Sequence, residues 1–213
     1  MAKQTKGLFK PTFYRLVRLT ARILSVYLFD IRCHDREETL VDGAAIILST
    51  HQSHFDPVLI GVTFNEHLNY LARRTLFDNA IFAWIIRMLD AIELDRDRSG
   101  LAGLKETMKR LKRGEKVLIF PEGTRSSDGK IAPLKPGFLS VARRTKVPLI
   151  PVAITGAYEA LPRGSKLPVL YPLRVAVGKH IEPAEFADLG DDEFLDLVRI
   201  RLQRCYDRAQ DSR

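Results

Sequence analysis

Short apolar runs that alternate with helix-like segments constrain the fold of this 213-residue chain more than any other feature. Residues 44–49 (AAIILS), 116–120 (KVLIF) and 148–153 (PLIPVA) have the length and composition of buried strands. Shorter strand candidates lie at residues 68–72, 91–94 and 174–177. Helical patterns separate them, starting near residue 57 and covering residues 79–89, 101–111, 138–144 and 191–208. This alternation predicts an α/β domain.

Composition excludes several classes of protein. With 46% hydrophobic residues, the chain is not a disordered basic tail. Its two cysteines, Cys33 and Cys205, do not make the disulfide framework of a small secreted domain, so we expect a reducing, cytoplasmic setting. No run of about 18 apolar residues occurs, which excludes a multi-spanning membrane protein.

The net charge of +8 is distributed in patches. Residues 1–36 hold eight Lys and Arg against two Asp, and residues 96–146 hold fourteen basic against five acidic residues. Residues 37–95 are acidic, with three basic against nine acidic residues. The pattern predicts one basic region at the N-terminus and another in the middle of the chain.

The first 36 residues have the composition of a helix that lies in a membrane interface. Arg15, Arg18 and Arg22 recur at helical spacing among large apolar residues. These arginines argue against both a transmembrane span and a cleavable signal. A core helix with arginines that extend to water is the alternative. We expect an amphipathic membrane-associating segment over residues 1–36 and a catalytic domain over residues 37–213.

The first concentration of chemistry is the segment HQSHFD at residues 51–56, directly after a predicted strand. A histidine and a carboxylate five residues apart can meet across a strand-to-helix turn. The carboxylate then accepts from one imidazole nitrogen and leaves the other free to take a proton. Because no serine or cysteine nucleophile motif accompanies the pair, we expect His51 to activate a hydroxyl group of a substrate.

On the residues alone, two other roles stay open. Asp56 precedes Pro57, as an N-cap precedes a proline at the first helical position. His51, His54 and Asp56 are also candidate metal ligands, although no second cluster completes a tetrahedral set.

Three further segments carry candidate functional residues. FPEGTRS, at residues 120–126, follows a predicted strand inside the central basic region and offers backbone N–H groups, hydroxyls and a guanidinium to a phosphate. Arg96 ends the segment IELDR at residues 92–96 and can supply a second guanidinium. VPLIPV, at residues 147–152, has the composition of a core strand, and the lining of an acyl-chain channel is its alternative role. A polar turn and solvated arginines are the structural alternatives.

Together, the four segments resemble, in order and separation, the sequence blocks of the glycerophosphate acyltransferase superfamily, most closely the 1-acylglycerol-3-phosphate acyltransferases. The His-x4-Asp block falls on residues 51–56, the second block on 92–96, the Phe-Pro-Glu-Gly-Thr-Arg-Ser block on 120–126 and the proline block on 147–152. The resemblance covers residues 43–180. The chain departs from the family pattern at Asp90, where glycine is usual, and at His54, where a large apolar or aromatic residue is usual.

The resemblance implies a fold and a set of site residues. The fold is a single α/β domain with a mixed, mostly parallel sheet flanked by helices. By analogy, His51 is the general base and Asp56 its orienting partner. The residues that bind or position the glycerol phosphate are then Arg96, Glu122, Gly123, Thr124 and Arg125.

The resemblance also implies an activity and its partners. The activity is transfer of an acyl group from acyl-CoA or acyl-acyl-carrier-protein to the free hydroxyl of a lysophospholipid, first of all 1-acylglycerol-3-phosphate, which gives phosphatidic acid. It implies no bound cofactor and no metal. The partners are the two substrates and a membrane surface, with acyl carrier protein as a further candidate. The protein is then peripheral on the cytoplasmic face of the cell membrane.

Three alternatives compete with this interpretation. An enzyme of the same family can act on another lyso-lipid, such as lyso-ornithine lipid. A non-catalytic lipid-binding protein would bind vesicles without turnover. A nucleic-acid-binding protein would explain the pI near 9.6 but none of the four segments, and no nucleic-acid-binding motif is present, so we expect no nucleic-acid partner.

Overall fold

The computed structural model describes residues 9–94, 101–165 and 167–211. The strands are β1 (Arg32–His34), β2 (Ile46–Ser49), β3 (Leu68–Arg73), β4 (Ala91–Leu94), β5 (Lys116–Ile119), β6 (Leu149–Thr155) and β7 (Arg174–Val177). The α-helices are α1 (Phe9–Phe29), α2 (Asp56–Thr63), α3 (Ala80–Met88), α4 (Leu101–Lys112), α5 (Leu139–Thr145), α6 (Ala157–Ala160), α7 (Pro183–Phe186) and α8 (Asp191–Gln210). Short 3-10 helices are η1 (Arg36–Thr39), η2 (Arg74–Phe77) and η3 (Pro136–Phe138).

The described strands form one mixed sheet in the order β1-β7-β6-β2-β5-β3-β4. Strands β6, β2, β5, β3 and β4 are parallel, whereas β7 is antiparallel to β6 and parallel to β1. The chain leaves β2 for β3 and β4, and then returns to place β5 and β6 on either side of β2. The strand order therefore reverses at β2, and ligands of open α/β sheets bind at the carboxyl ends of strands near such a reversal.

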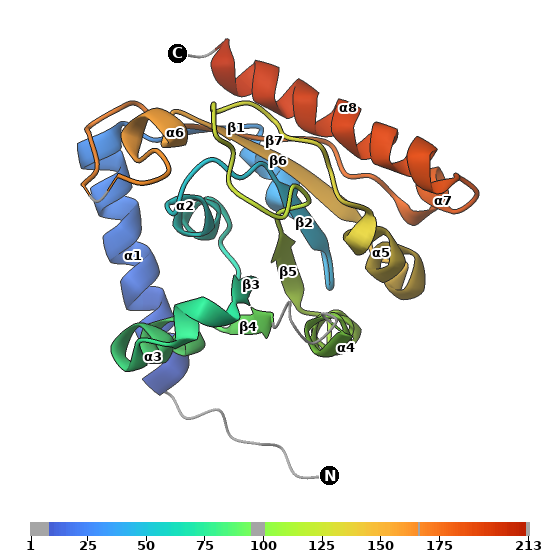
Figure 1. Ribbon diagram of the computed structural model, residues 1–213, viewed down its shortest axis with the longest axis horizontal. Helices are drawn as coiled ribbons and strands as arrows, with labels where there is room; N and C mark the ends of the chain where they lie inside the picture. Colours follow the sequence, from blue (N-terminus) through green and yellow to red (C-terminus); the bar gives the residue numbers. More distant parts are fainter. Residues whose placement is uncertain (1–8, 95–100, 166, 212–213) are drawn as a thin grey trace.

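Helices cover both faces of the sheet because the side chains of each central strand alternate between two cores. Ile46 and Leu48 of β2 pack with α4, α5, α7 and α8 on one face. Ala45 and Ile47 pack with α2 and α6 on the other face. Figure 1 shows the resulting layers, with α8 and α5 on the side of the sheet opposite α2.

The predicted α/β fold is confirmed. Each strand and helix predicted from the apolar patterns is present, with ends that differ by only a few residues. Among the described strands and α-helices, three short ones were not predicted, namely β1, α6 and α7, and the short 3-10 helices were not predicted either. Strand β1 has only three residues, Arg-Cys-His, and lies at the edge of the sheet, so it carries no apolar run that a pattern could detect.

Helix α1 packs on α2 and α3 with a side that carries both aromatic and polar residues, and the rings of Phe13 and Phe29 contact Trp84 and Phe55. Tyr14 and Ser25 are buried on this side, and the guanidinium of Arg18 donates to the backbone carbonyls of Asn65 and Glu66. The side of α1 that carries Arg18 is thus partly used in packing.

The opposite side of α1 is apolar and exposed. It presents seven large side chains, Leu16, Leu19, Ile23, Leu24, Val26, Tyr27 and Leu28. A core helix turns its apolar stripe inward, so the core-helix alternative for this segment does not hold. Among the described residues, no helix combines the length and hydropathy needed to cross a bilayer.

Gly156, between β6 and α6, lies where the backbone packs closely against the segment before β7. Its φ is +88°, and a Cβ at this position would lie 2.2 Å from the carbonyl oxygen of Pro172. Gly43 also has a positive φ, +77°, but open space around it. We expect Gly43→Ala to cost about 1 kcal/mol of unfolding free energy from the left-handed conformation alone, and Gly156→Ala to cost at least about twice as much. Equal losses in urea denaturation would contradict this packing.

Candidate active site

The candidate site lies where β2 and β5 end side by side. His51 follows β2 by two residues, and Phe120 and Glu122 follow β5. The imidazole of His51 stacks on the ring of Phe120, with centroids 4.0 Å apart and an interplanar angle of 18°. The backbone N–H of Ser126 donates to the carbonyl oxygen of His51 at 2.7 Å. The two segments that were predicted separately therefore form one site at the carboxyl edge of the sheet.

His51 and Asp56 meet as the spacing predicts. Nδ1 of His51 lies 2.8 Å from Oδ2 of Asp56, whose side chain is fully buried. Because a carboxylate can only accept, Nδ1 carries the proton and Nε2 keeps a free lone pair. The side chain of His51 is 19% exposed, so solvent and ligands can reach the imidazole.

The turn from β2 to α2 holds the carboxylate of Asp56 through backbone donors. The N–H groups of Gln52 and Ser53 donate to Oδ2, at 2.5 and 2.8 Å. Burial raises the pKa of Asp56, and the bonds from His51 and these amides oppose that rise.

The capping alternative for Asp56 is wrong. The N-cap of α2 is Phe55, Asp56 is the first helical residue, and no side chain caps the helix. Its carboxylate accepts hydrogen bonds from backbone N–H groups before the helix, because the turn folds back over the carboxylate.

Glu122 is a second buried carboxylate, and it binds the backbone of His51. Its Oε1 accepts from the His51 N–H at 2.7 Å, and its Oε2 accepts from the Ala132 N–H at 3.0 Å. The residue is 2% exposed, and burial raises its pKa to about 7, with the nearby charge of Asp56 acting in the same direction. Through these contacts, Glu122 joins the loop after β5 to the turn between β2 and α2.

The next three residues of the loop lie near the basic side chains of Lys135 and Arg163. Gly123 has a φ of +68°, and the side chain of Lys135 packs where its Cβ would be. Thr124 and Arg125 follow, both half-buried. Burial and the positive charge of Arg163 lower the pKa of Arg125. The charge of Asp56 opposes this lowering, but among the described residues Arg125 makes no ion pair with an acid, so its guanidinium is available to an anion.

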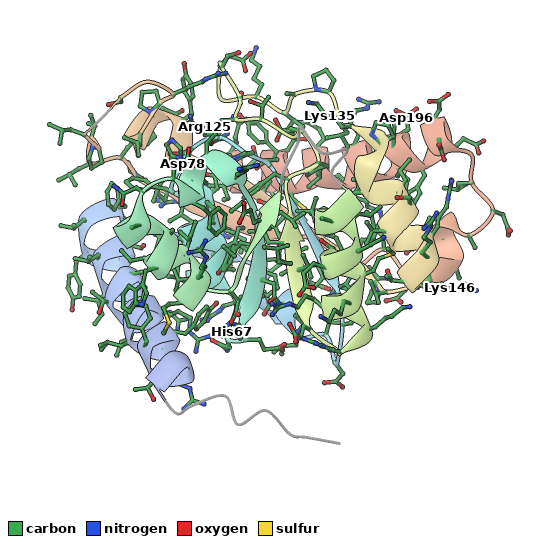
Figure 2. The ribbon with its side chains drawn as sticks, turned by 60° about the horizontal axis from the view of Figure 1, so that its bottom comes forward. His67, Asp78, Arg125, Lys135, Lys146 and Asp196 are labelled. Carbon is green, nitrogen blue, oxygen red and sulfur yellow. The ribbon has the colours of Figure 1, made fainter. Side chains whose placement is uncertain are left out.

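His54 and Asp90 are the two departures from the family pattern. His54 is exposed beside the site, and partial burial together with the charge of Arg125 lowers its pKa. Asp90 has a φ of +59°, a conformation that favours glycine. Its carboxylate is held by His67 and by Arg110, with 3.7 Å between Oδ1 and the guanidinium. Figure 2 shows His67 on the edge of the molecule opposite Arg125, so Asp90 lies away from the site.

Other predicted segments have different outcomes. Arg96 lies outside the described residues. Residues 147–152 enter β6, whose side chains are all buried, so this segment is a core strand as expected. No group of three His, Cys, Asp or Glu side chains in the described ranges is arranged to hold a metal ion.

Several contacts at the site were missed from the sequence. The hydroxyl of Ser53 donates to the carbonyl of Leu161 at 2.9 Å. The side-chain amide of Gln52 donates to the carbonyl of Gly129. Gln52 and Ser53 lie inside the His-x4-Asp block, which is a positional signal, but their partners are distant in sequence.

The fold and this site together define an α/β domain with a carboxylate-oriented histidine beside a loop that bears the guanidinium of Arg125. Residues 30–155 match the acyltransferase family profile. A 1-acyl-sn-glycerol-3-phosphate acyltransferase of Bacillus subtilis is 31% identical over 166 residues, which cover 78% of this chain and 80% of that protein. The chain therefore belongs to the acyltransferase family.

Two further likenesses agree with this assignment. A probable 1-acyl-sn-glycerol-3-phosphate acyltransferase of Mycoplasma genitalium is 25% identical over 207 residues, 91% of this chain and 75% of that protein. The crystal structure of the 1-acyl-sn-glycerophosphate (LPA) acyltransferase PlsC from Thermotoga maritima matches with a TM-score of 0.81, covering 95% of this chain and 83% of that one. At 24% identity, this structure supports the fold alone.

The raised pKa of Glu122 predicts a pH dependence of stability. Its pKa is about 7 in the folded protein and near 4.5 when unfolded, so the folded state binds more protons between these values. Stability due to this group is therefore full below about pH 4.5 and is lost as the pH rises towards 7. The unfolding free energy of the wild type minus that of Glu122→Gln should fall over this range by up to about 3 kcal/mol. Glu93→Gln, at an exposed position, is the control, and a flat difference for Glu122→Gln would contradict the assignment.

Proposed function

We propose that this protein transfers a fatty acyl group from an acyl thioester to the free hydroxyl of 1-acylglycerol-3-phosphate, which produces phosphatidic acid for phospholipid synthesis. One observation carries the proposal above all, the 2.8 Å hydrogen bond that orients His51 on Asp56 beside the loop that bears Arg125. The relatives named 1-acyl-sn-glycerol-3-phosphate acyltransferase support the choice of acceptor.

The proposed reaction is a direct transfer. Nε2 of His51 takes the proton of the acceptor hydroxyl while the hydroxyl oxygen attacks the carbonyl carbon of the thioester. The tetrahedral intermediate collapses with cleavage of the C–S bond, and the imidazolium returns the proton to the departing thiolate. The products are an ester and a free thiol, and no acyl-enzyme forms. Asp56 stabilises the imidazolium, and general-base catalysis of this kind contributes roughly 10² to 10⁴ in rate.

The acceptor phosphate binds to the loop after β5 in this proposal. Gly123, Thr124 and Arg125 contribute backbone, hydroxyl and guanidinium donors, and Arg96 contributes a second guanidinium. Glu122 has a positioning role, since both of its oxygens bind backbone N–H groups. The acyl donor is acyl-CoA or acyl-acyl-carrier-protein, and the chemistry requires no bound cofactor.

Two variants test the catalytic pair. His51→Ala and Asp56→Asn should each lower the transfer of a radiolabelled acyl group to lysophosphatidic acid by at least about 10²-fold, because the base is removed or loses its orienting charge. The matched controls are His67→Ala, at the opposite edge of the molecule (Figure 2), and Asp196→Asn, on the exposed side of α8. Full activity of His51→Ala, with circular dichroism like that of the wild type, would refute the mechanism.

A panel of acceptors decides the substrate within the family. Lysophosphatidic acid, lysophospholipids with larger head groups and lyso-ornithine lipid are each supplied with both donors. Preference for lysophosphatidic acid supports the proposal, and preference for lyso-ornithine lipid would replace the acceptor. Binding of lipid without turnover of any acceptor would favour a non-catalytic protein.

We also propose that residues 1–36 attach the protein peripherally to the cytoplasmic face of the membrane. The seven exposed apolar side chains of α1 support this, because a contiguous apolar surface on a water-soluble domain marks an interaction site. The helix contains no acidic residue, which suits an anionic lipid surface. Both cysteines are free thiols, in keeping with a reducing compartment.

Replacing two exposed residues of α1 tests this attachment. Leu19→Gln with Ile23→Gln keeps good helix propensity and removes two apolar side chains from the exposed face. Binding to vesicles that contain phosphatidylglycerol should weaken by roughly tenfold or more in a flotation assay. Ile200→Gln, an exposed apolar residue on α8 across the sheet, is the control. Equal binding by all three proteins would exclude α1 as the anchor.

A further inference from the structure

The segment between α6 and β7 exposes an unusual amount of apolar surface. Three large apolar side chains within four residues are mostly exposed: Leu167 at 78%, Val169 at 62% and Leu170 at 67%. Nothing in the fold requires these side chains, since burial of the neighbouring Leu161 and Leu173 already anchors both ends of the segment.

Backbone hydrogen bonds hold the segment in a defined shape. The N–H of Ser165 donates to the carbonyl of Pro162 at 3.1 Å, which closes a turn. The N–H of Val169 donates to the carbonyl of Ala160 at 2.8 Å, which brings the chain back to the end of α6. The exposed apolar side chains are therefore displayed by a structured loop.

This loop connects the active site to helix α1. At its start, the carbonyl of Leu161 accepts from the hydroxyl of Ser53, two residues from His51. At its end, the N–H of Leu173 donates to the carbonyl of Phe29, the last residue of α1, at 3.0 Å. Figure 1 shows the loop beside the C-terminal end of α1, where Tyr27 and Leu28 are also exposed.

Charge identifies the occupant of this surface. Residues 161–173 include Arg163 and Lys166 and no acidic residue, and α1 contains no Asp or Glu either. Arg163 is exposed and lies close enough to Arg125 for its positive charge to act on that residue. The exposed acids beside these segments are Glu159 and Asp30, and Asp30 is paired with Arg32 and Arg174. An apolar loop and an apolar helix side, both without acidic residues of their own, match a leaflet of anionic lipids, with acyl chains under negative headgroups.

We propose that residues 161–173 form a second lipid-contacting element, which inserts Leu167, Val169 and Leu170 into the same anionic leaflet as α1. The inference rests on the proposed function in one respect, that the substrates are lipids. The loop places the entrance of the site at the headgroup level. Arg163 then lies among the phosphates from which the acceptor is drawn.

A fluorescent label at position 167 tests the insertion without any measurement of turnover. Burial raises the pKa of the Cys33 and Cys205 thiols to about 11 and about 12, so near pH 7.5 an exposed introduced cysteine reacts preferentially with an environment-sensitive dye. Leu167→Cys, Leu24→Cys on α1 and Ile200→Cys on α8 are labelled, with the wild type as the background control. Each full-length protein is mixed with vesicles of phosphatidylcholine and phosphatidylglycerol.

The expected result is a blue shift and increased emission at positions 167 and 24 on addition of vesicles, and no change at position 200. Leu167→Ser with Leu170→Ser should also bind these vesicles roughly tenfold more weakly than the wild type. A response at position 24 alone would overturn the proposal, as would no response at either position. A shift at position 167 that grows with protein concentration in the absence of lipid would overturn it in favour of a second copy of the chain. Because none of these readouts requires acyl transfer, failure of the loop proposal is distinguishable from failure of the proposed function.

Discussion

The hydrogen bond between the buried carboxylate of Asp56 and His51 is the interaction on which the rest of the site depends. A buried charge is costly unless it is hydrogen-bonded, and here two backbone N–H groups and the imidazole supply the bonds. The same bonds fix the turn between β2 and α2. A second buried carboxylate, that of Glu122, holds the backbone of His51. One acid therefore orients the side chain of the histidine and the other orients its main chain. The charge of Asp56 also disfavours ionisation of Glu122, in the same direction as burial.

Much of the fold was predictable from the sequence because the central strands are buried on both faces. Such strands read as continuous apolar runs, and β2, β5 and β6 were found in this way. Strand β1 and helices α6 and α7 were not, because three or four residues are too few to show a period. The direction of packing of α1 was also inaccessible. Its sequence shows that one side is polar and the other apolar, but only the structure shows that Arg18 and Arg22 turn toward the protein.

The site was predictable in proportion to how local its contacts are. His51 and Asp56 are five residues apart, and their meeting followed from the spacing. The contacts of Glu122 with His51 and of Ser53 with Leu161 join segments 71 and 108 residues apart, and no spacing rule reaches that far. Glu122 was expected to bind or position substrate, and its two backbone partners favour positioning. The glycine that is usual at position 90 has a physical reason, since the backbone there is left-handed. In this chain, contacts with His67 and Arg110 hold an aspartate in that conformation.

The inward-facing arginines of α1 have a consequence for how the protein would leave a membrane. Ionic strength weakens attraction between exposed charges and lipid headgroups, but it has little effect on charges already engaged by the protein. Arg18 is held by carbonyl groups of the domain, and the exposed side of α1 presents large apolar side chains. Washing membranes with concentrated salt would therefore remove only the electrostatic part of the attachment. Extraction with a mild detergent, which offers the apolar side chains another hydrocarbon phase, would release the enzyme.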